Sequence, residues 1–110
     1  MSCLFCRIIN GEIPSSKVYE DERVLAFRDI DPQAPTHILI IPKTHYDSIL
    51  DADPDTIAYM TGIVKRIAES EGLCENGFRL VINTGDEGGQ SVKHLHMHLL
   101  GGRSMQWPPG

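Results

Sequence analysis

The sequence predicts an α+β domain in which an antiparallel sheet of about five strands carries one long and one short helix. Short β-rich runs separated by polar turns indicate hairpins. One longer segment repeats apolar residues at helical spacing, and no strand–helix–strand unit recurs along the chain. The 110 residues fit one domain spanning 1–110, and a hydrophobic share of 41% is enough for a core without a disulfide scaffold.

The first half of the chain predicts a short helix followed by three strands. Residues 3–9 form the helix, and Gly11 helps to end it. The strands cover residues 17–19, 24–27 and 36–41. The polar turn at 20–23 joins the first two strands as a hairpin. The third strand is rich in Ile and Leu and ends at Pro42, so we expect it to be mostly buried.

The second half predicts the long helix and two further strands. Asp53 is a favourable N-cap and Pro54 suits the first helical position, so the helix begins there. Gly72 stands where a C-terminal glycine ends a helix. Between them, apolar residues recur at helical spacing at Ile57, Met60, Val64, Ile67 and Ala68. The strands cover residues 78–83 and 94–100 and flank a glycine-containing loop at 84–90.

Charge and hydropathy argue against nucleic-acid and membrane partners. A formal net charge of −5 and a pI near 5.4 lack the basic footprint of a nucleic-acid-binding protein. The N-terminus does not resemble a signal peptide, and the apolar run 38–41 is too short to span a bilayer, so we expect no membrane partner. Three cysteines are an odd number, which argues against a closed disulfide set and favours a cytoplasmic location.

A run of alternating histidines, His94 to His98, is the strongest chemical signal. On a strand, residues two apart share a face, so the three imidazoles point to one open face about 6.5–7 Å apart, and Leu95, Met97 and Leu99 point to the core. An exposed strand face that happens to be His, a catalytic zinc site and nucleophilic catalysis by a neutral imidazole all remain open. Three of five histidines on one strand favour a functional site.

The same run resembles the signature of the histidine triad (HIT) family, in which three histidines alternate with apolar residues. Other segments resemble its Hint branch, the histidine triad nucleotide-binding proteins, and together they cover nearly the whole chain: residues 26–30, 32–37, 41–43, 88–92, 100–103 and 107–110. The resemblance implies a HIT-like fold whose sheet continues across a homodimer. Lys93 departs from the family, since related sequences often carry an aromatic residue there.

For activity, the resemblance implies hydrolysis of purine nucleoside phosphoramidates, such as AMP joined through nitrogen to an amine. His96 would be the nucleophile and form a nucleotidyl-histidine, and His98 would contact the phosphate or the leaving group. Ser91 would place its hydroxyl near the scissile bond, and His37 would support the hydrogen bonding of the triad. Two alternatives stay open, a dinucleoside polyphosphate hydrolase and a nucleotide-binding regulatory or scaffold protein with little activity.

The resemblance also implies contacts to an AMP or GMP class of nucleotide. Asp29 would accept hydrogen bonds from the ribose hydroxyls, with Phe27 and Ile30 lining the purine pocket. The loop before the triad can bring backbone N–H groups close to phosphate oxygens, because glycine tolerates the required dihedrals. The expected nucleotide contacts are Phe27, Asp29, Ile30, Asn83, Gly89, Gln90, Ser91, His96 and His98. Plain turn residues at Asp29 and Asn83, and a core histidine at His37, remain alternatives.

The pair Cys3 and Cys6 suggests a second function for the first histidine of the triad. The pair alone fits a redox motif, half of a zinc site or two buried thiols. Structural zinc needs four ligands, and His45 and His94 complete the set, as they do in some microbial members of the family. The expected cofactor is therefore a structural Zn²⁺ that fixes the chain next to the nucleophile, with no organic cofactor.

Overall fold

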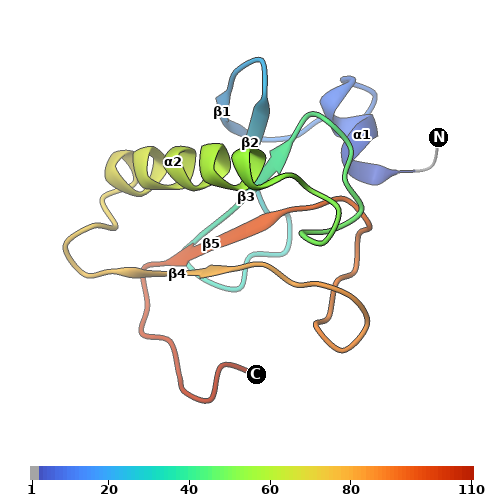
Figure 1. Cartoon of the computed structure of the whole chain (residues 1–110). Helices are drawn as coiled ribbons and strands as arrows, with labels where there is room; N and C mark the ends of the chain where they lie inside the picture. The colour runs from blue at the N-terminus through green and yellow to red at the C-terminus, as the bar shows by residue number, and fades with distance from the viewer. Residues whose placement is uncertain (1–2) are drawn as a thin grey trace.

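A five-stranded antiparallel sheet, in the order β1-β2-β3-β5-β4, is the centre of the part of the chain that the structure describes, residues 3–110. In this computed structural model the strands are β1 (Lys17–Glu20), β2 (Val24–Arg28), β3 (Thr36–Pro42), β4 (Phe78–Val81) and β5 (Met97–Gly101). The described residues also form two helices, α1 (Leu4–Ile9) and α2 (Pro54–Ser70) (Figure 1). The predicted α+β class, the strand number and the helix pair are confirmed.

The long helix begins and ends where its sequence signals predict. The carboxylate of Asp53 accepts a hydrogen bond from the backbone N–H of Thr56 at 2.8 Å, and Pro54 occupies the first helical turn. Gly72, directly after the C-cap, has a φ of 72°, which a residue with a side chain rarely adopts. None of the described helices is long and apolar enough to cross a membrane.

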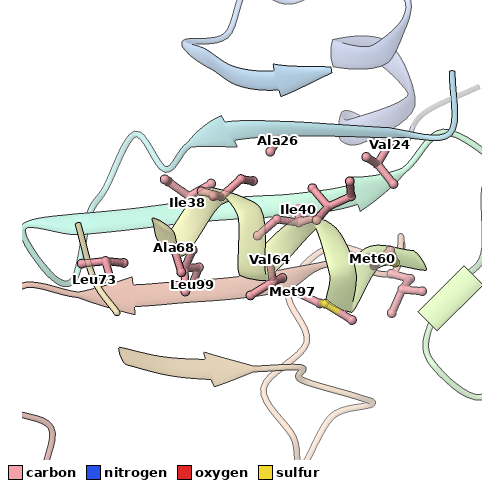
Figure 2. Close-up of a cluster of buried hydrophobic side chains, with 13 residues drawn as sticks. Val24, Ala26, Ile38, Ile40, Met60, Val64, Ala68, Leu73, Met97 and Leu99 are labelled. Atoms are coloured by element: carbon pink, nitrogen blue, oxygen red, sulfur yellow. The ribbon is translucent and has the colours of Figure 1, made fainter. Parts of the chain in front are cut away.

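Alternation along the strands creates two apolar layers on opposite faces of the sheet. One face packs on α2, as Figure 2 shows, and joins Ile38 and Ile40 of β3 to Met97 and Leu99 of β5. The other face packs on the shorter helix. It buries Phe5, Ile8, Leu25, Phe27, Leu39 and Ile41. His98 pairs with Leu39 across the sheet, and His37 shares the face of Leu39, so these polar groups lie on the α1 side.

Both C-terminal strands are shorter than predicted. β4 ends at Val81 and β5 starts only at Met97, so residues 94–96 are not part of the strand. Met97 is the first residue of β5 to pair with β3, and it lies opposite Ile40. β3 ends at Pro42, which has no N–H to extend the ladder. Residues 94–96 bond instead to a loop, where the N–H of Leu95 donates to the carbonyl of Tyr46 at 2.7 Å.

Candidate functional site

A cavity of about 290 Å³ opens on the α1 face of the sheet, where an apolar wall meets a group of polar side chains. Helix α1, strand β2 and Leu39 of β3 contribute to the wall, while Asp29 and the segment from Ser91 to His98 contribute polar groups. Phe27, Asp29, Ile30, Ser91, His96 and His98 all line this one cavity. Half a dozen of the residues predicted to contact nucleotide are thus brought together in space.

His96 is held in a single tautomer. Its Nδ1 lies 2.7 Å from the backbone carbonyl of His94, and because a carbonyl only accepts, Nδ1 carries the proton. The lone pair of the neutral ring is therefore on Nε2. The ring is buried, and burial lowers the pKa of His96 below its usual value, so it is neutral near pH 7. A neutral imidazole with a free Nε2 on a cavity wall is ready to act as a nucleophile.

His98 is fixed in the opposite tautomer through His37. The backbone N–H of Gln33 donates to Nδ1 of His37 at 3.0 Å, so His37 carries its proton on Nε2. That Nε2–H donates to Nδ1 of His98 at 2.9 Å. His98 therefore keeps its own proton on Nε2 and can donate it to an acceptor in the cavity. Burial is the main cause that lowers the pKa of His98 to about 4.

Asp29 adds the one carboxylate that lines the described part of this cavity. One of its oxygens accepts a hydrogen bond from the backbone N–H of Asp31 at 2.8 Å, and the other lies 3.5 Å from Nε2 of His37. The side chain is 20% exposed, so the carboxylate keeps contact with solvent and with any ligand in the cavity. It is placed to accept hydrogen bonds from ligand hydroxyls.

A second cluster lies behind the cavity and consists of Cys3, Cys6, His45 and His94, whose ligand atoms lie within 4.8 Å of one another. Nε2 of His94 donates to the carbonyl of Pro42 at 2.8 Å, and Nε2 of His45 donates to the Asp47 carboxylate at 2.8 Å. Both rings therefore turn an unprotonated Nδ1 toward the cluster. Holding the outer nitrogen in this way is the usual support for a metal-bound imidazole.

The four donor atoms fit a tetrahedral metal. The two Nδ1 atoms are only 3.1 Å apart, and their lone pairs repel unless a cation or a proton lies between them. The sulfurs lie beside the same nitrogens. Cys3 Sγ is 3.4 Å from Nδ1 of His94, and Cys6 Sγ is 3.3 Å from Nδ1 of His45 and 3.6 Å from Nδ1 of His94. Two thiolates and two imidazoles are a common ligand set for structural zinc.

Comparison with known proteins identifies the family. The family model described as "HIT domain" matches residues 10–105. The chain belongs to the HIT domain family. It is 55% identical to the 14 kDa zinc-binding protein of Zea mays, over 97% of this chain and 87% of that protein. It is 51% identical to the adenylylsulfatase HINT1 of Arabidopsis thaliana, over 97% of this chain and 76% of that protein.

Solved structures of HIT proteins agree with this fold. A HIT family hydrolase from Legionella pneumophila superposes with a TM-score of 0.95 at 55% identity and covers 99% of this chain and 100% of its own. A histidine triad nucleotide-binding protein from Candida albicans reaches a TM-score of 0.87 at 36% identity, over 99% of this chain and 85% of its own. The predicted family and its fold are therefore confirmed.

In this HIT domain the histidine run does not form one open face. His94 and His96 are buried, and only His98 is partly exposed. The rings of His96 and His98 have centroids 4.9 Å apart, closer than the spacing of about 6.5–7 Å expected along a strand. The three rings do share one side of the sheet, as predicted, but α1 covers that side, and Phe5 packs against both His94 and His96. The opposite orientation of Leu95, Met97 and Leu99 into the core is as predicted.

Three predicted nucleotide contacts lie off the cavity of this HIT domain: Asn83, Gly89 and Gln90. Gln90 braces loops instead, because its Nε2 donates to the carbonyls of Asp47 at 2.6 Å and Val92 at 3.0 Å. Its Oε1 accepts from the N–H of Gly85 at 3.0 Å. Gly89 is exposed and has a φ of 77°, so it serves the turn, and Asn83 is half-buried beyond the end of β4.

Sequence reasoning missed several groups that shape the site. Leu4, Phe5 and Ile8 of α1 form a wall of the cavity, and the amphipathic spacing of residues 4, 5 and 8 was a signal for this. The backbone donor of Gln33 and the backbone acceptor of Pro42 set the tautomers of two histidines. Backbone groups of this kind leave no signal in the sequence, since every residue has a carbonyl and every residue except proline has an N–H.

Proposed function

We propose that this chain hydrolyses purine nucleoside phosphoramidates with His96 as the nucleophile. The observation that supports this most strongly is the tautomer of His96, because Nδ1–H is engaged by the His94 carbonyl and Nε2 keeps its lone pair on a ring that lines the cavity. A purine base would lie against the apolar wall that includes Phe27 and Ile30. The ribose hydroxyls would donate to Asp29.

In the first step, Nε2 of His96 attacks the phosphorus in line, a P–N bond to His96 forms and the P–N bond to the amine breaks. The electron pair leaves with the amine nitrogen, which takes a proton from solvent through the Ser91 hydroxyl. The Nε2–H of His98 donates to a phosphate oxygen and stabilises the charge on it. The His96 ring becomes cationic, and its hydrogen bond to the His94 carbonyl strengthens as this charge develops.

In the second step, water attacks the phosphorus of the nucleotidyl-histidine. The bond from phosphorus to Nε2 breaks, and its electron pair returns to His96. A nucleoside monophosphate, AMP or GMP, leaves with the oxygen of the water, and one proton passes to solvent. The cationic ring is a good leaving group because it becomes neutral on departure.

We infer that the metal cluster of Cys3, Cys6, His45 and His94 holds a structural Zn²⁺. The donor set and the outer hydrogen bonds of both histidines support this, and the Zea mays relative is named a zinc-binding protein. A bound zinc ion would cross-link α1 to the loops that carry His45 and His94. Thiolate ligands agree with a reducing compartment such as the cytoplasm.

We also propose a homodimer whose sheet continues across β4. This strand is an edge of the sheet, and exposed edges of apolar strands are managed by pairing or covering. Phe78 on β4 is 41% exposed, and Trp107 in the C-terminal tail is 81% exposed. A second copy of the chain would cover both.

A second substrate class shares the same first step. The Arabidopsis relative is named an adenylylsulfatase, and in an adenylyl sulfate the same phosphorus would be attacked while sulfate leaves. Sulfate needs no proton to depart, so this substrate depends less on Ser91 than a phosphoramidate does. A comparison of Ser91→Ala on both substrates separates the two leaving groups.

The experiment that tests the proposal compares hydrolysis of an adenosine phosphoramidate by the wild type and by His96→Ala, with folding checked by circular dichroism. We expect the folded variant to lose at least about 10³-fold in rate. Mass spectrometry of rapidly quenched wild type should show an adenylate on the peptide that contains His96. Equal rates for both proteins would refute the mechanism, and an inactive wild type that still binds AMP would indicate a nucleotide-binding module instead.

A further inference from the structure

We propose that the metal site and the nucleotide cavity are energetically coupled, so that each ligand strengthens the binding of the other. The inference rests on the proposed zinc and nucleotide binding and goes beyond them, because it gives the metal a regulatory effect on the cavity. The two sites touch through α1, through His94 and through the loop braced by Gln90.

Helix α1 belongs to both sites. Cys3 caps its N-terminus and Cys6 lies one turn later, and both sulfurs face the metal cluster. Leu4, Phe5 and Ile8 of the same helix line the nucleotide cavity. A helix of 6 residues is too short to be stable alone, so its position depends on what holds its ends. A metal that binds two of its sulfurs would fix the wall of the cavity.

His94 gives a second link, which reaches the proposed nucleophile. Its Nδ1 belongs to the metal cluster, while its backbone carbonyl accepts the Nδ1–H of His96 at 2.7 Å. The ring of Phe5 packs edge-on against both imidazoles, with centroid distances of 5.9 Å to His94 and 5.1 Å to His96. A metal that anchors the His94 ring would therefore also anchor the group that sets the tautomer of His96.

The third link joins the loop of the metal ligand His45 to the loop of Ser91. Asp47 holds the His45 ring through its carboxylate, and its backbone carbonyl accepts from Gln90 at 2.6 Å. Gln90 also donates to the carbonyl of Val92, beside Ser91 on the cavity wall. A second hollow of about 630 Å³ lies between the two sites, and it shares Leu4, Ser91 and Val92 with the nucleotide cavity.

Coupling of this kind must be reciprocal. If metal raises the affinity for a nucleotide by some factor, the nucleotide raises the affinity for the metal by the same factor. The physical source is ordering: the first ligand restrains α1 and the loops at 45–47 and 90–96, and the second ligand then binds groups that are already in place. Coupling factors between protein sites typically exceed about 5-fold, which sets the size of the effect to look for.

The test measures zinc affinity of the intact protein by competition with a chromophoric chelator, with and without saturating AMP. We expect AMP to raise the zinc affinity at least about 5-fold. Calorimetry on zinc-loaded and zinc-stripped protein should give the same factor for AMP. Nitrogen-15 NMR of the histidine rings adds a readout of the tautomer, since removing zinc should shift the Nε2 signal of His96 toward that of a mixed tautomer.

Two variants test the route of the coupling. Phe5→Leu keeps an apolar residue on α1 but removes the ring that touches both imidazoles, and we expect the coupling factor to fall below half of the wild-type value. Ile67→Val is the matched control, because it removes one methylene from the core on the opposite face of the sheet. The Ile67→Val variant should keep the wild-type coupling factor. If zinc and AMP were coupled only because zinc removal unfolds the whole protein, both variants would show the same factor.

Each outcome decides between the inference and the function on which it rests. If zinc and AMP both bind but leave each other's affinity unchanged, the inference is wrong and the proposed function stands. If Phe5→Leu couples as strongly as Ile67→Val, the route through α1 is wrong. Failure to bind zinc refutes the inference and the proposed structural zinc but leaves the proposed hydrolysis standing. Failure to bind AMP refutes both the inference and the proposed substrate.

Discussion

His98 accepts a hydrogen bond from His37 at 2.9 Å, across two neighbouring strands of the sheet. This bond decides which nitrogen of His98 faces the cavity with a proton. The tautomer of His37 is itself set by the backbone N–H of Gln33, so a chain of three groups ends in one N–H donor that faces the cavity. Under the proposed mechanism, His37 is therefore a positioning residue that acts through His98.

Replacing His37 by Phe should therefore lower kcat without preventing the substrate from binding. Nδ1 of His98 would lose its buried partner, at a cost of about 1–3 kcal/mol, or about 5- to 150-fold in kcat. KM should change much less, since the introduced phenyl ring would not touch the nucleotide. Steady-state kinetics with an adenosine phosphoramidate measure both constants. A loss confined to KM would contradict the assigned role, and His37→Gln, which can still donate, should recover part of kcat.

The stability of the protein should fall as pH falls from about 6.5 to about 4, partly because of His98. Burial lowers the pKa of His98 to about 4 in the folded state, so in this window the unfolded chain binds more protons than the folded chain. Protons therefore favour unfolding, by less than about 3 kcal/mol for this group. His98→Asn should have a flatter curve of unfolding free energy against pH. Urea denaturation at several pH values measures it, and parallel curves would refute the assignment.

Metal content should follow the four predicted ligands. We expect one zinc per chain in the wild type and in His96→Ala, and its loss in His45→Ala. His45→Ala should also melt at least about 5 °C lower, because the cross-link to α1 disappears. Cys74→Ser is the matched control, since Cys74 is exposed and outside the cluster. Elemental analysis and calorimetry check both points. Zinc retained in His45→Ala but lost in His96→Ala would favour a catalytic metal.

Asp29 should discriminate substrates by their ribose hydroxyls. Asp29→Asn removes the charge that would accept them, and hydrogen bonds to charged groups contribute about 1.5–3 kcal/mol, or roughly 10- to 150-fold in kcat/KM. A 2′,3′-dideoxy substrate should be penalised in the wild type by a similar factor and little further in the variant. If the loss from Asp29→Asn and the loss from removing the ribose hydroxyls add in full, Asp29 does not contact the ribose.

The edge of β4 should control assembly. Phe78→Lys places a charge on the exposed edge and should convert a dimer into a monomer of 12.2 kDa. Leu50→Lys is the control, because Leu50 is 84% exposed and is not part of β4. Light scattering after size-exclusion chromatography gives the mass of each variant. A wild type that already elutes at the mass of one chain would refute the proposed homodimer.

The elements that the sequence predicted well are those with local signals. Asp53, Pro54 and Gly72 mark the ends of α2 by their own chemistry, and the structure agrees with each. The ends of β4 and β5 were harder, since a strand stops where its partner stops, and the partner lies far away in the chain. β5 starts late because the N–H of Leu95 bonds to the carbonyl of Tyr46 in a distant loop, although β3 continues two residues past Ile40, the partner of Met97.

The candidate site likewise contains features with local sequence signals, which could be predicted, and features that depend on distant contacts, which could not. The residue types and spacing of the triad indicated the site, and the structure gathers His96, His98, Asp29 and Ser91 around one cavity. The role of Gln90 could not be predicted, because the carbonyl of Asp47 that it holds is 43 residues away. The buried positions of His94 and His96 were missed for a related reason: alternation predicts which side a ring points to, but not that the distant helix α1 covers that side.

The two faces of strand β3 belong to different parts of the protein. Ile38 and Ile40 face the α2 core, whereas His37 and Leu39 face the cavity side. Neighbouring positions of one strand therefore pack in different layers. The cavity wall is itself a buried layer, since wall residues such as Phe5 are almost fully buried. A substitution that reshapes the cavity therefore also disturbs the packing under α1, so the shape of this cavity and the stability of the fold cannot change independently.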